Sequence, residues 1–119
     1  MKTSYFANIP FIDTDIYCPV SISVYAPDWY AGIEFHQLSP TASILKRYKR
    51  GLITVEQYTN EFNEQVLAKY NPDVLYAKLV GIKKNREPIL LCYEKPNQFC
   101  HRHLVAAWFN QSGKFVEEL

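Results

Sequence analysis

The feature that most constrains the fold is a continuous apolar run late in the chain, from Ile89 to Tyr93. The run lacks the alternation of apolar and polar residues that marks a strand with one face in water. A short run of this kind is typical of a strand that is covered on both faces, as in the parallel sheets of α/β proteins. We therefore expect a central strand here, with helices packed against the sheet.

Strand and helix patterns precede this run. Residues 2–7 can extend as a first strand, and Pro19–Tyr25 alternates valine and isoleucine with serine, which predicts a second. A helix is predicted next, with Ser39 as its N-cap, Pro40 in its first position and Gly51 at its end.

Three further helices follow. Thr54 and Gln57 have the spacing of a capping box at the start of the second helix, and Asn71 followed by proline opens a short third one. The last helix is expected to begin near Cys100. In its helical wheel His101 shares a stripe with apolar residues and points inward, whereas Arg102 points outward or toward the rim of a site.

These patterns predict a single α/β domain over residues 1–119, with a short, mostly parallel sheet flanked by helices. In such sheets ligands bind outside the carboxyl ends of the strands. We expect three segments to meet there: the residues after the first strand, the aromatic loop after the second strand, and residues 92–102.

Composition narrows the classes of function. The net charge is +1, with 13 basic and 12 acidic side chains, which gives no electrostatic reason to bind duplex nucleic acid or a membrane surface. No apolar segment reaches the length of a membrane span. The three cysteines, Cys18, Cys92 and Cys100, are too few and too uneven for a secreted disulfide framework. We expect reduced thiols in a cytoplasmic protein, and the sequence does not indicate its oligomeric state.

The polar residues that interrupt the late apolar segment mark the candidate site. Two thiols, a carboxylate, an imidazole and a guanidinium lie within a dozen residues: Cys92, Glu94, Cys100, His101 and Arg102. An apolar strand ending in Cys-x-Glu, a short loop, and Cys-His-Arg opening a helix together resemble the domain of unknown function family 488.

Other parts of the chain are similar to the short branch of that family. They include the first strand, the serine-rich second strand, and a P-x-W-Y-x-G segment that starts at Pro27. The resemblance spans nearly the whole chain and implies an α/β fold and a site at the late motif. Many relatives end the second strand in Asp-x-Arg, whereas this chain has Ser23-Val24-Tyr25 there, so no role of that acid and base is carried over.

The residues support an enzyme as the first hypothesis. A cysteine at a helix N-terminus, such as Cys100, gains thiolate stabilisation from the helix dipole and from a nearby imidazolium or guanidinium. His101 could contact Cys92 or Glu94, and Glu94 could act as a general acid or base if desolvation raises its pKa. Arg102 or the free N–H groups of the helix start could hold an anion.

Several alternatives stay open. Each cysteine could simply be packed, and a His101–Glu94 pair could only pin the helix to the strand. No cofactor is predicted, and zinc remains a weaker alternative, with Cys92, Cys100 and one histidine as ligands. Cys92 and Cys100 could also form a redox pair. A phosphatase-like anion cradle is disfavoured because the loop between them has no glycine.

The aromatic loop suggests a substrate class. Trp29, Tyr30 and His36 flank Gly32, which would let the loop close as a lid while the rings stack on a base. We therefore favour an enzyme, a hydrolase or transferase, for a nucleotide-like or other anionic small molecule. The alternative is a non-catalytic module that binds a ligand or sequesters a protein, in which the polar cluster is structural. The predicted ligand-binding residues are Ser4, Tyr25, Trp29, Tyr30 and His36.

Overall fold

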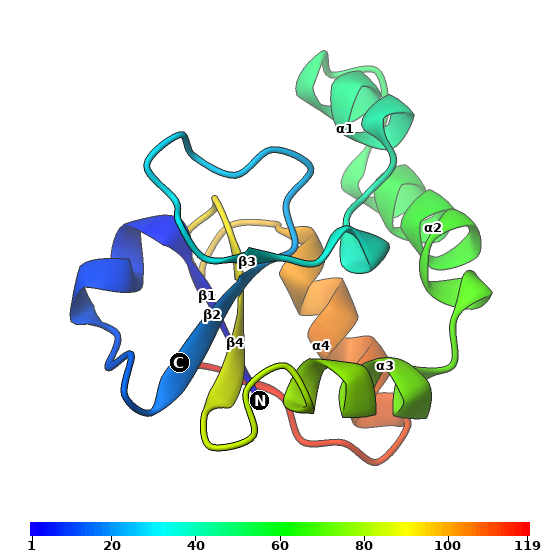
Figure 1. The fold of residues 1–119 in the computed structure, drawn as a ribbon. Coiled ribbons are helices and arrows are strands. Elements are labelled where there is room, and N and C mark those ends of the chain that lie inside the picture. Colours follow the sequence, from blue (N-terminus) through cyan, green and yellow to red (C-terminus); the bar gives the residue numbers. More distant parts are fainter.

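The computed structural model describes residues 1–119 and confirms the α/β fold: five parallel strands form one sheet in the order β3-β2-β4-β1-β5 (Figure 1). The strands are β1 (Lys2–Tyr5), β2 (Tyr17–Ser21), β3 (Ile33–Glu34), β4 (Glu87–Cys92) and β5 (Glu117–Glu118). The α-helices are α1 (Ala42–Lys49), α2 (Val55–Gln65), α3 (Pro72–Val80) and α4 (His101–Gln111), and the 3-10 helices are η1 (Phe6–Phe11), η2 (His36–Leu38) and η3 (Leu67–Lys69).

The late apolar run lies at the centre of the sheet, as its pattern predicts. β4 is hydrogen-bonded to β1 on one side and to β2 on the other. Leu90 belongs to the main core, whereas Ile89 and Leu91 belong to a smaller cluster on the opposite face. All three side chains are fully buried, which explains why the run has no polar positions.

The two faces of the sheet are covered unequally. Helices α2, α3 and α4 lie on one side in Figure 1, and their apolar residues form the main core with the sheet. The other face is covered by η1 and by the loop between β2 and β3, through a smaller apolar cluster around Phe6. None of the helices combines the length and the apolar composition that a membrane-spanning segment requires.

The second strand is shorter at its end than its alternation predicts. β2 stops at Ser21, and it starts before Pro19. On the side of β2 that faces away from β4, β3 pairs only with Val20 and Ser21. Pro19 therefore has no neighbouring strand on that side. That position suits a residue without a backbone N–H.

Ser39 is not the N-cap of α1, contrary to the prediction. Thr41 has that role, and its side chain accepts a hydrogen bond from the backbone N–H of Ile44. The hydroxyl of Ser39 is instead 2.9 Å from the carbonyl oxygen of Ile22 and 3.1 Å from that of Ser23. Ser39 therefore ties the loop to the end of β2, a contact that local spacing cannot reveal.

The other helix signals are confirmed. Thr54 and Gln57 form both hydrogen bonds of a capping box, and the side chain of Asn71 caps α3. Gly51 follows α1 with a φ of 71°, a left-handed conformation that favours glycine. Cys100 is the N-cap residue of α4, as expected.

Candidate functional site

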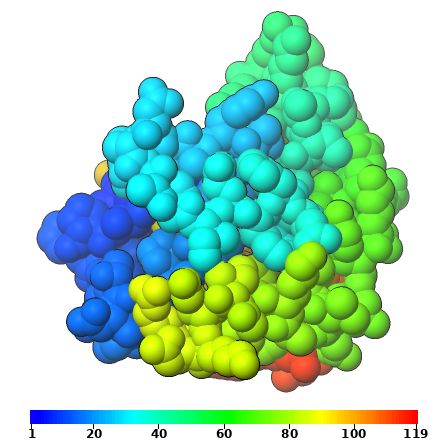
Figure 2. All heavy atoms as spheres, in the orientation of Figure 1, coloured from blue at the N-terminus to red at the C-terminus, as the bar shows by residue number.

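A cavity of about 330 Å³ opens at the carboxyl ends of β2 and β4. Its walls come from the segments after these two strands, from the start of α4, and from α1 and α2 on the opposite side. Figure 2 shows a notch in this region of the surface, between the cyan loop after β2 and the projecting α1. The lining residues are Ser23, Val24, Tyr25, Pro40, Leu45, Tyr48, Lys49, Tyr58, Cys92, Tyr93, Glu94, Phe99, Cys100 and His101.

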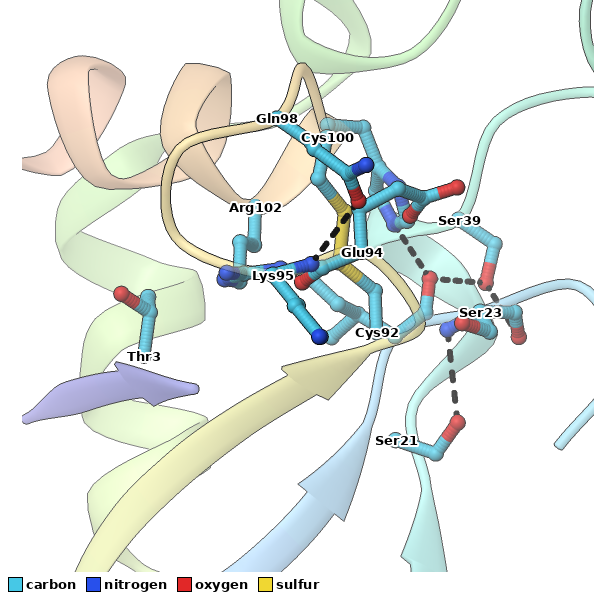
Figure 3. The surroundings of a disulfide bond; sticks show 12 residues. Thr3, Ser21, Ser23, Ser39, Cys92, Glu94, Lys95, Gln98, Cys100 and Arg102 are labelled. Carbon is cyan, nitrogen blue, oxygen red and sulfur yellow. Dashed lines mark hydrogen bonds between the residues drawn. A yellow bond between two sulfur atoms is a disulfide. The ribbon is translucent and has the colours of Figure 1, made fainter. Parts of the chain in front are cut away.

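Cys92 and Cys100 are joined by a disulfide bond that links the end of β4 to the start of α4 (Figure 3). Both residues are buried and line the cavity. The expectation that every cysteine is reduced is therefore wrong for this pair in the structure, and only Cys18 is free. The strand end and the helix start are close because α4 packs directly on β4, which brings residues eight apart in the sequence together.

The His101 side chain points inward, as the helical wheel predicts, and it is 6% exposed. Its Nε2 atom is 2.7 Å from the carbonyl oxygen of Ile22 at the end of β2. A carbonyl only accepts, so Nε2 carries the proton and Nδ1, 3.8 Å from the Cys100 sulfur, is unprotonated. Burial lowers the pKa of His101 to about 4, so the imidazole is neutral at pH 7.

The predicted contact between His101 and Glu94 is not formed. One nitrogen of the imidazole is bonded to Ile22 and the other faces Cys100. Glu94 has an exposed side chain and lies at the rim of the same cavity. The two residues therefore share the cavity without forming a pair.

Arg102 is completely buried, so the prediction that it points outward or to the rim is wrong. Its Nε and Nη2 atoms donate to the carboxylate of Glu118, at 3.1 and 2.8 Å. Its Nη1 donates to the sulfur of Cys92 at 3.0 Å and to the carbonyl oxygen of Glu94 at 2.7 Å. These partners occupy the guanidinium, which leaves it no free fork for an anion in the cavity.

Three potential metal ligands lie close together at the base of the cavity. The sulfurs of Cys92 and Cys100 and a ring nitrogen of His101 all lie within 4.8 Å of one another. Zinc is held by thiolates, and the two sulfurs joined in a disulfide supply none. The cluster is therefore not evidence for a zinc site in this form of the protein.

The predicted ligand-binding residues divide into two groups. Tyr25 lines the cavity, and its backbone oxygen accepts a hydrogen bond from the hydroxyl of Tyr93. The others lie outside the cavity walls: buried Ser4 accepts from Asn8, and exposed His36 is 3.6 Å from Glu34. Trp29 and Tyr30 also lie outside the cavity walls.

The three segments expected at the strand ends do meet. The ring of Phe6, just after β1, packs edge to face against the rings of Trp29, Tyr30 and Tyr93. This contact lies on the face of the sheet opposite the main core, beside the cavity. Gly32 has a steric role there, because a Cβ atom would collide with the ring of Tyr30.

Sequence reasoning missed the far wall of the cavity. It is formed by Tyr48 and Lys49 of α1, Tyr58 of α2, and Phe99 before α4. The rings of Tyr48, Tyr58 and Phe99 pack edge to face on one another. The two tyrosines lie on different helices, and the tertiary packing of α1 and α2 places them in one wall of the cavity that the disulfide also lines.

Comparison with known proteins identifies the family. The sequence matches DUF488-N3a, described as the active DUF488-N3 subclade, over residues 12–113. Searches of curated proteins and of solved structures gave no match. Because the matched region covers most of the chain and contains the Cys-x-Glu and Cys-His-Arg motifs, this protein belongs to the DUF488 family.

Proposed function

We propose that this protein is an enzyme that converts a nucleotide-like or other anionic small molecule in the cavity, with Cys92 of the reduced form as its nucleophile. The observation that carries this proposal is the hydrogen bond from Arg102 Nη1 to the Cys92 sulfur, at 3.0 Å. A buried guanidinium next to a sulfur that lines a cavity is an arrangement that favours a reactive thiolate.

The contacts favour Cys92 over Cys100 as the nucleophile. Only Cys92 receives a hydrogen bond from the guanidinium, whereas Cys100 faces His101, which is neutral at pH 7. The active form arises when a small-molecule thiol reduces the disulfide: two reducing thiols become one disulfide, and Cys92 and Cys100 become thiols. Cys100 is then a partner that can reform the disulfide.

The reaction is a group transfer in two steps. The Cys92 thiolate forms a bond to the electrophilic phosphorus or carbon, the bond to the leaving oxygen breaks, and that oxygen takes up a proton from the solvent. In the second step a water molecule or another acceptor gives a proton to Glu94 and bonds to the transferred group. The bond to sulfur then breaks, the Cys92 thiolate is restored, and Glu94 releases its proton to the solvent.

The residues that line the cavity suit a ligand that contains an aromatic ring and carries a negative charge. Tyr48, Tyr58 and Phe99 present ring surface to a base, and Lys49 is the cation among the lining residues. The first turn of α4 adds the partial positive charge of a helix N-terminus near Cys100. A base-sized ring with an attached phosphate or carboxylate fits this combination.

The family supports a catalytic role. The matched subclade is described as active, and the match includes the residues from Cys92 to Arg102. Glu94 and Cys92 line one cavity, so a carboxylate and a thiol can reach the same bound molecule.

The proposal is tested with reduced protein and two chromogenic substrates, nitrophenyl phosphate and the nitrophenyl ester of a nucleoside monophosphate. Release of nitrophenolate that falls roughly 100-fold or more in Cys92→Ser would support it. The matched control is Cys18→Ser, a buried cysteine outside the cavity, which is expected to keep the activity. Equal rates in the Cys92→Ser variant and the parent protein would exclude a Cys92 nucleophile.

A second candidate, thiol–disulfide exchange, is favoured by the disulfide at the cavity wall. Complete reduction of a small disulfide to two thiols needs both cysteines, because Cys100 must attack the mixed disulfide on Cys92 and release the second thiol, whereas group transfer needs only Cys92. Cys100→Ser therefore separates the two: it stops at a mixed disulfide on Cys92 and cannot complete the reduction of a small disulfide, but it leaves nitrophenolate release intact. A nucleotide that binds the reduced protein without being converted would instead favour a non-catalytic binding module.

A further inference from the structure

The C-terminal strand reaches the candidate site through one side chain. β5 pairs with β1 at the edge of the sheet, and this pairing places Thr3 beside Glu118. The carboxylate of Glu118 accepts hydrogen bonds from Arg102 and, at 2.6 Å, from the hydroxyl of Thr3. Thr3 and Glu118 both lie outside the residues that match the family.

The contact between Glu118 and Arg102 also determines where the rest of the guanidinium group points. The guanidinium group is planar and rigid, so a carboxylate that holds Nε and Nη2 also fixes the direction of Nη1. Nη1 is the atom that donates to the Cys92 sulfur and to the Glu94 carbonyl oxygen. Figure 3 shows Arg102 extending from the start of α4 toward the loop after β4, on the side of the disulfide that faces β1.

We propose that Glu118 is a positioning residue, which aims Nη1 of Arg102 at the sulfur of Cys92 and thereby sets the reactivity of the Cys92 thiol. This inference rests on the proposed function, in which the reduced Cys92 is the nucleophile. Glu118 does not line the cavity and acts through Arg102.

The ionisation state of Glu118 is consistent with this positioning role. Burial by itself would raise the pKa of Glu118, but the hydrogen bonds from Arg102 and Thr3 outweigh it and lower the pKa below its ordinary value. The carboxylate is therefore ionised at neutral pH, as a bidentate partner of arginine must be.

The positioning role and a purely electrostatic role predict opposite signs. As a negative charge alone, Glu118 would oppose the Cys92 thiolate, and its neutralisation would make Cys92 ionise at lower pH. If Glu118 instead fixes the position of Arg102, it stabilises the Cys92 thiolate indirectly. Replacement of Glu118 would then make Cys92 ionise at higher pH. The other charged or titratable groups around Cys92 and Glu118 are the same residues in both proteins. They are Arg102, His101 and His103 on α4, Tyr93 and Glu94 on the loop, Tyr25 after β2, Tyr48 and Lys49 on α1, and Tyr58 on α2.

The test measures alkylation of Cys92 by iodoacetamide as a function of pH. Cys18→Ser and Cys100→Ser leave Cys92 as the sole thiol of the parent protein. In this parent the alkylation rate should reach half its maximum below about pH 8.5, the value of an ordinary cysteine. Glu118→Gln should move this midpoint upward by about one pH unit, so that the rate at neutral pH falls roughly tenfold.

Three further variants make the result specific. Glu118→Asp keeps the carboxylate and should restore part of the shift. Thr3→Val removes one support of Glu118 and should move the midpoint upward by less than Glu118→Gln does. Glu117→Gln is the matched control, since this neighbouring glutamate pairs with Lys2 and does not contact Arg102; it should leave the midpoint unchanged. Circular dichroism verifies that each protein is folded.

The outcomes separate the two proposals. A midpoint that is low in the parent, but unchanged or lower in Glu118→Gln, overturns the positioning role and leaves the proposed function intact. A parent whose midpoint is no lower than that of an unstructured peptide cysteine overturns both. If Glu118→Gln does not fold, Glu118→Asp and Thr3→Val decide by the same rule.

Discussion

His101 should make the stability of this protein depend on pH, because its imidazole is buried. Burial lowers the pKa of His101 from its ordinary value of 6.5 to about 4. The unfolded chain therefore binds a proton at a pH where the folded protein does not. The stabilisation is complete above about pH 6.5 and is lost as the pH falls toward about 4.

The difference between the folded and unfolded pKa values of His101 sets the size of the pH-dependent change in the free energy of unfolding. Each unit of difference corresponds to about 1.4 kcal/mol, so the full contribution is about 3 kcal/mol. Between about pH 7.5 and pH 5, linkage gives a loss of about 2 kcal/mol in the free energy of unfolding. A second histidine, His103, acts in the same direction, because burial also lowers its pKa.

The assay compares wild type with His101→Gln by urea denaturation across this pH range, followed by tryptophan fluorescence. The glutamine amide can still donate to the Ile22 carbonyl but cannot take up a proton. It loses the ring contact with Phe62, which lowers stability equally at every pH. The difference in unfolding free energy between the two proteins should therefore shrink by about 2 kcal/mol from pH 7.5 to pH 5.

His36→Gln is the matched control, since the side chain of His36 is exposed on the surface. Its unfolding free energy should follow that of wild type at each pH. His103 is present in all three proteins, so most of its own contribution cancels. A difference between wild type and His101→Gln that stays constant with pH would refute the reasoning that burial keeps His101 neutral.

The remaining predictions concern stability. Arg102→Met should lower the free energy of unfolding by about 3 kcal/mol in urea denaturation, because it removes a fully buried charge from its hydrogen-bonded partners; a change below about 1 kcal/mol would contradict the buried network. Reduction of the disulfide should cost about 2 kcal/mol in the same assay, since the bond closes a loop between cysteines eight apart; a Cys92→Ser variant should show no such response to the reductant. Thr54→Ala should lower stability by about 1 kcal/mol through loss of the capping box, and an unchanged melting curve would show that this cap is not needed.

Much of the fold follows from local sequence. The unbroken apolar run predicts the central strand because a strand with neighbours on both faces has no position for a polar side chain. Thr54, Asn71 and Gly51 mark helix ends because unpaired backbone groups there need a side-chain partner or a left-handed turn. The start of α4 and the inward direction of His101 follow from the same local rules.

The candidate site was only partly predictable. Residues 92–102 were identified as a group, and several of them do line one cavity. The hydrogen-bond partners of these residues lie elsewhere in the chain, so the spacing of residues in the sequence could not predict them. His101 is hydrogen-bonded to Ile22, and Arg102 is hydrogen-bonded to Glu118. The helical wheel placed Arg102 outward or toward the rim because it considers only the apolar stripe of its own helix, whereas the side chain is buried by contacts with other elements.

The sequence by itself determined the class of fold, the place of the central strand and the segment that lines the candidate site, because these depend on periodicity and on backbone caps. The tertiary structure decided that the guanidinium of Arg102 donates to the sulfur of Cys92, and that Glu118 of the last strand binds Arg102. It also decided which aromatic rings and which lysine line the cavity together with the disulfide. Those contacts join residues far apart in the chain, and they depend on strand order and helix packing, which no local pattern encodes.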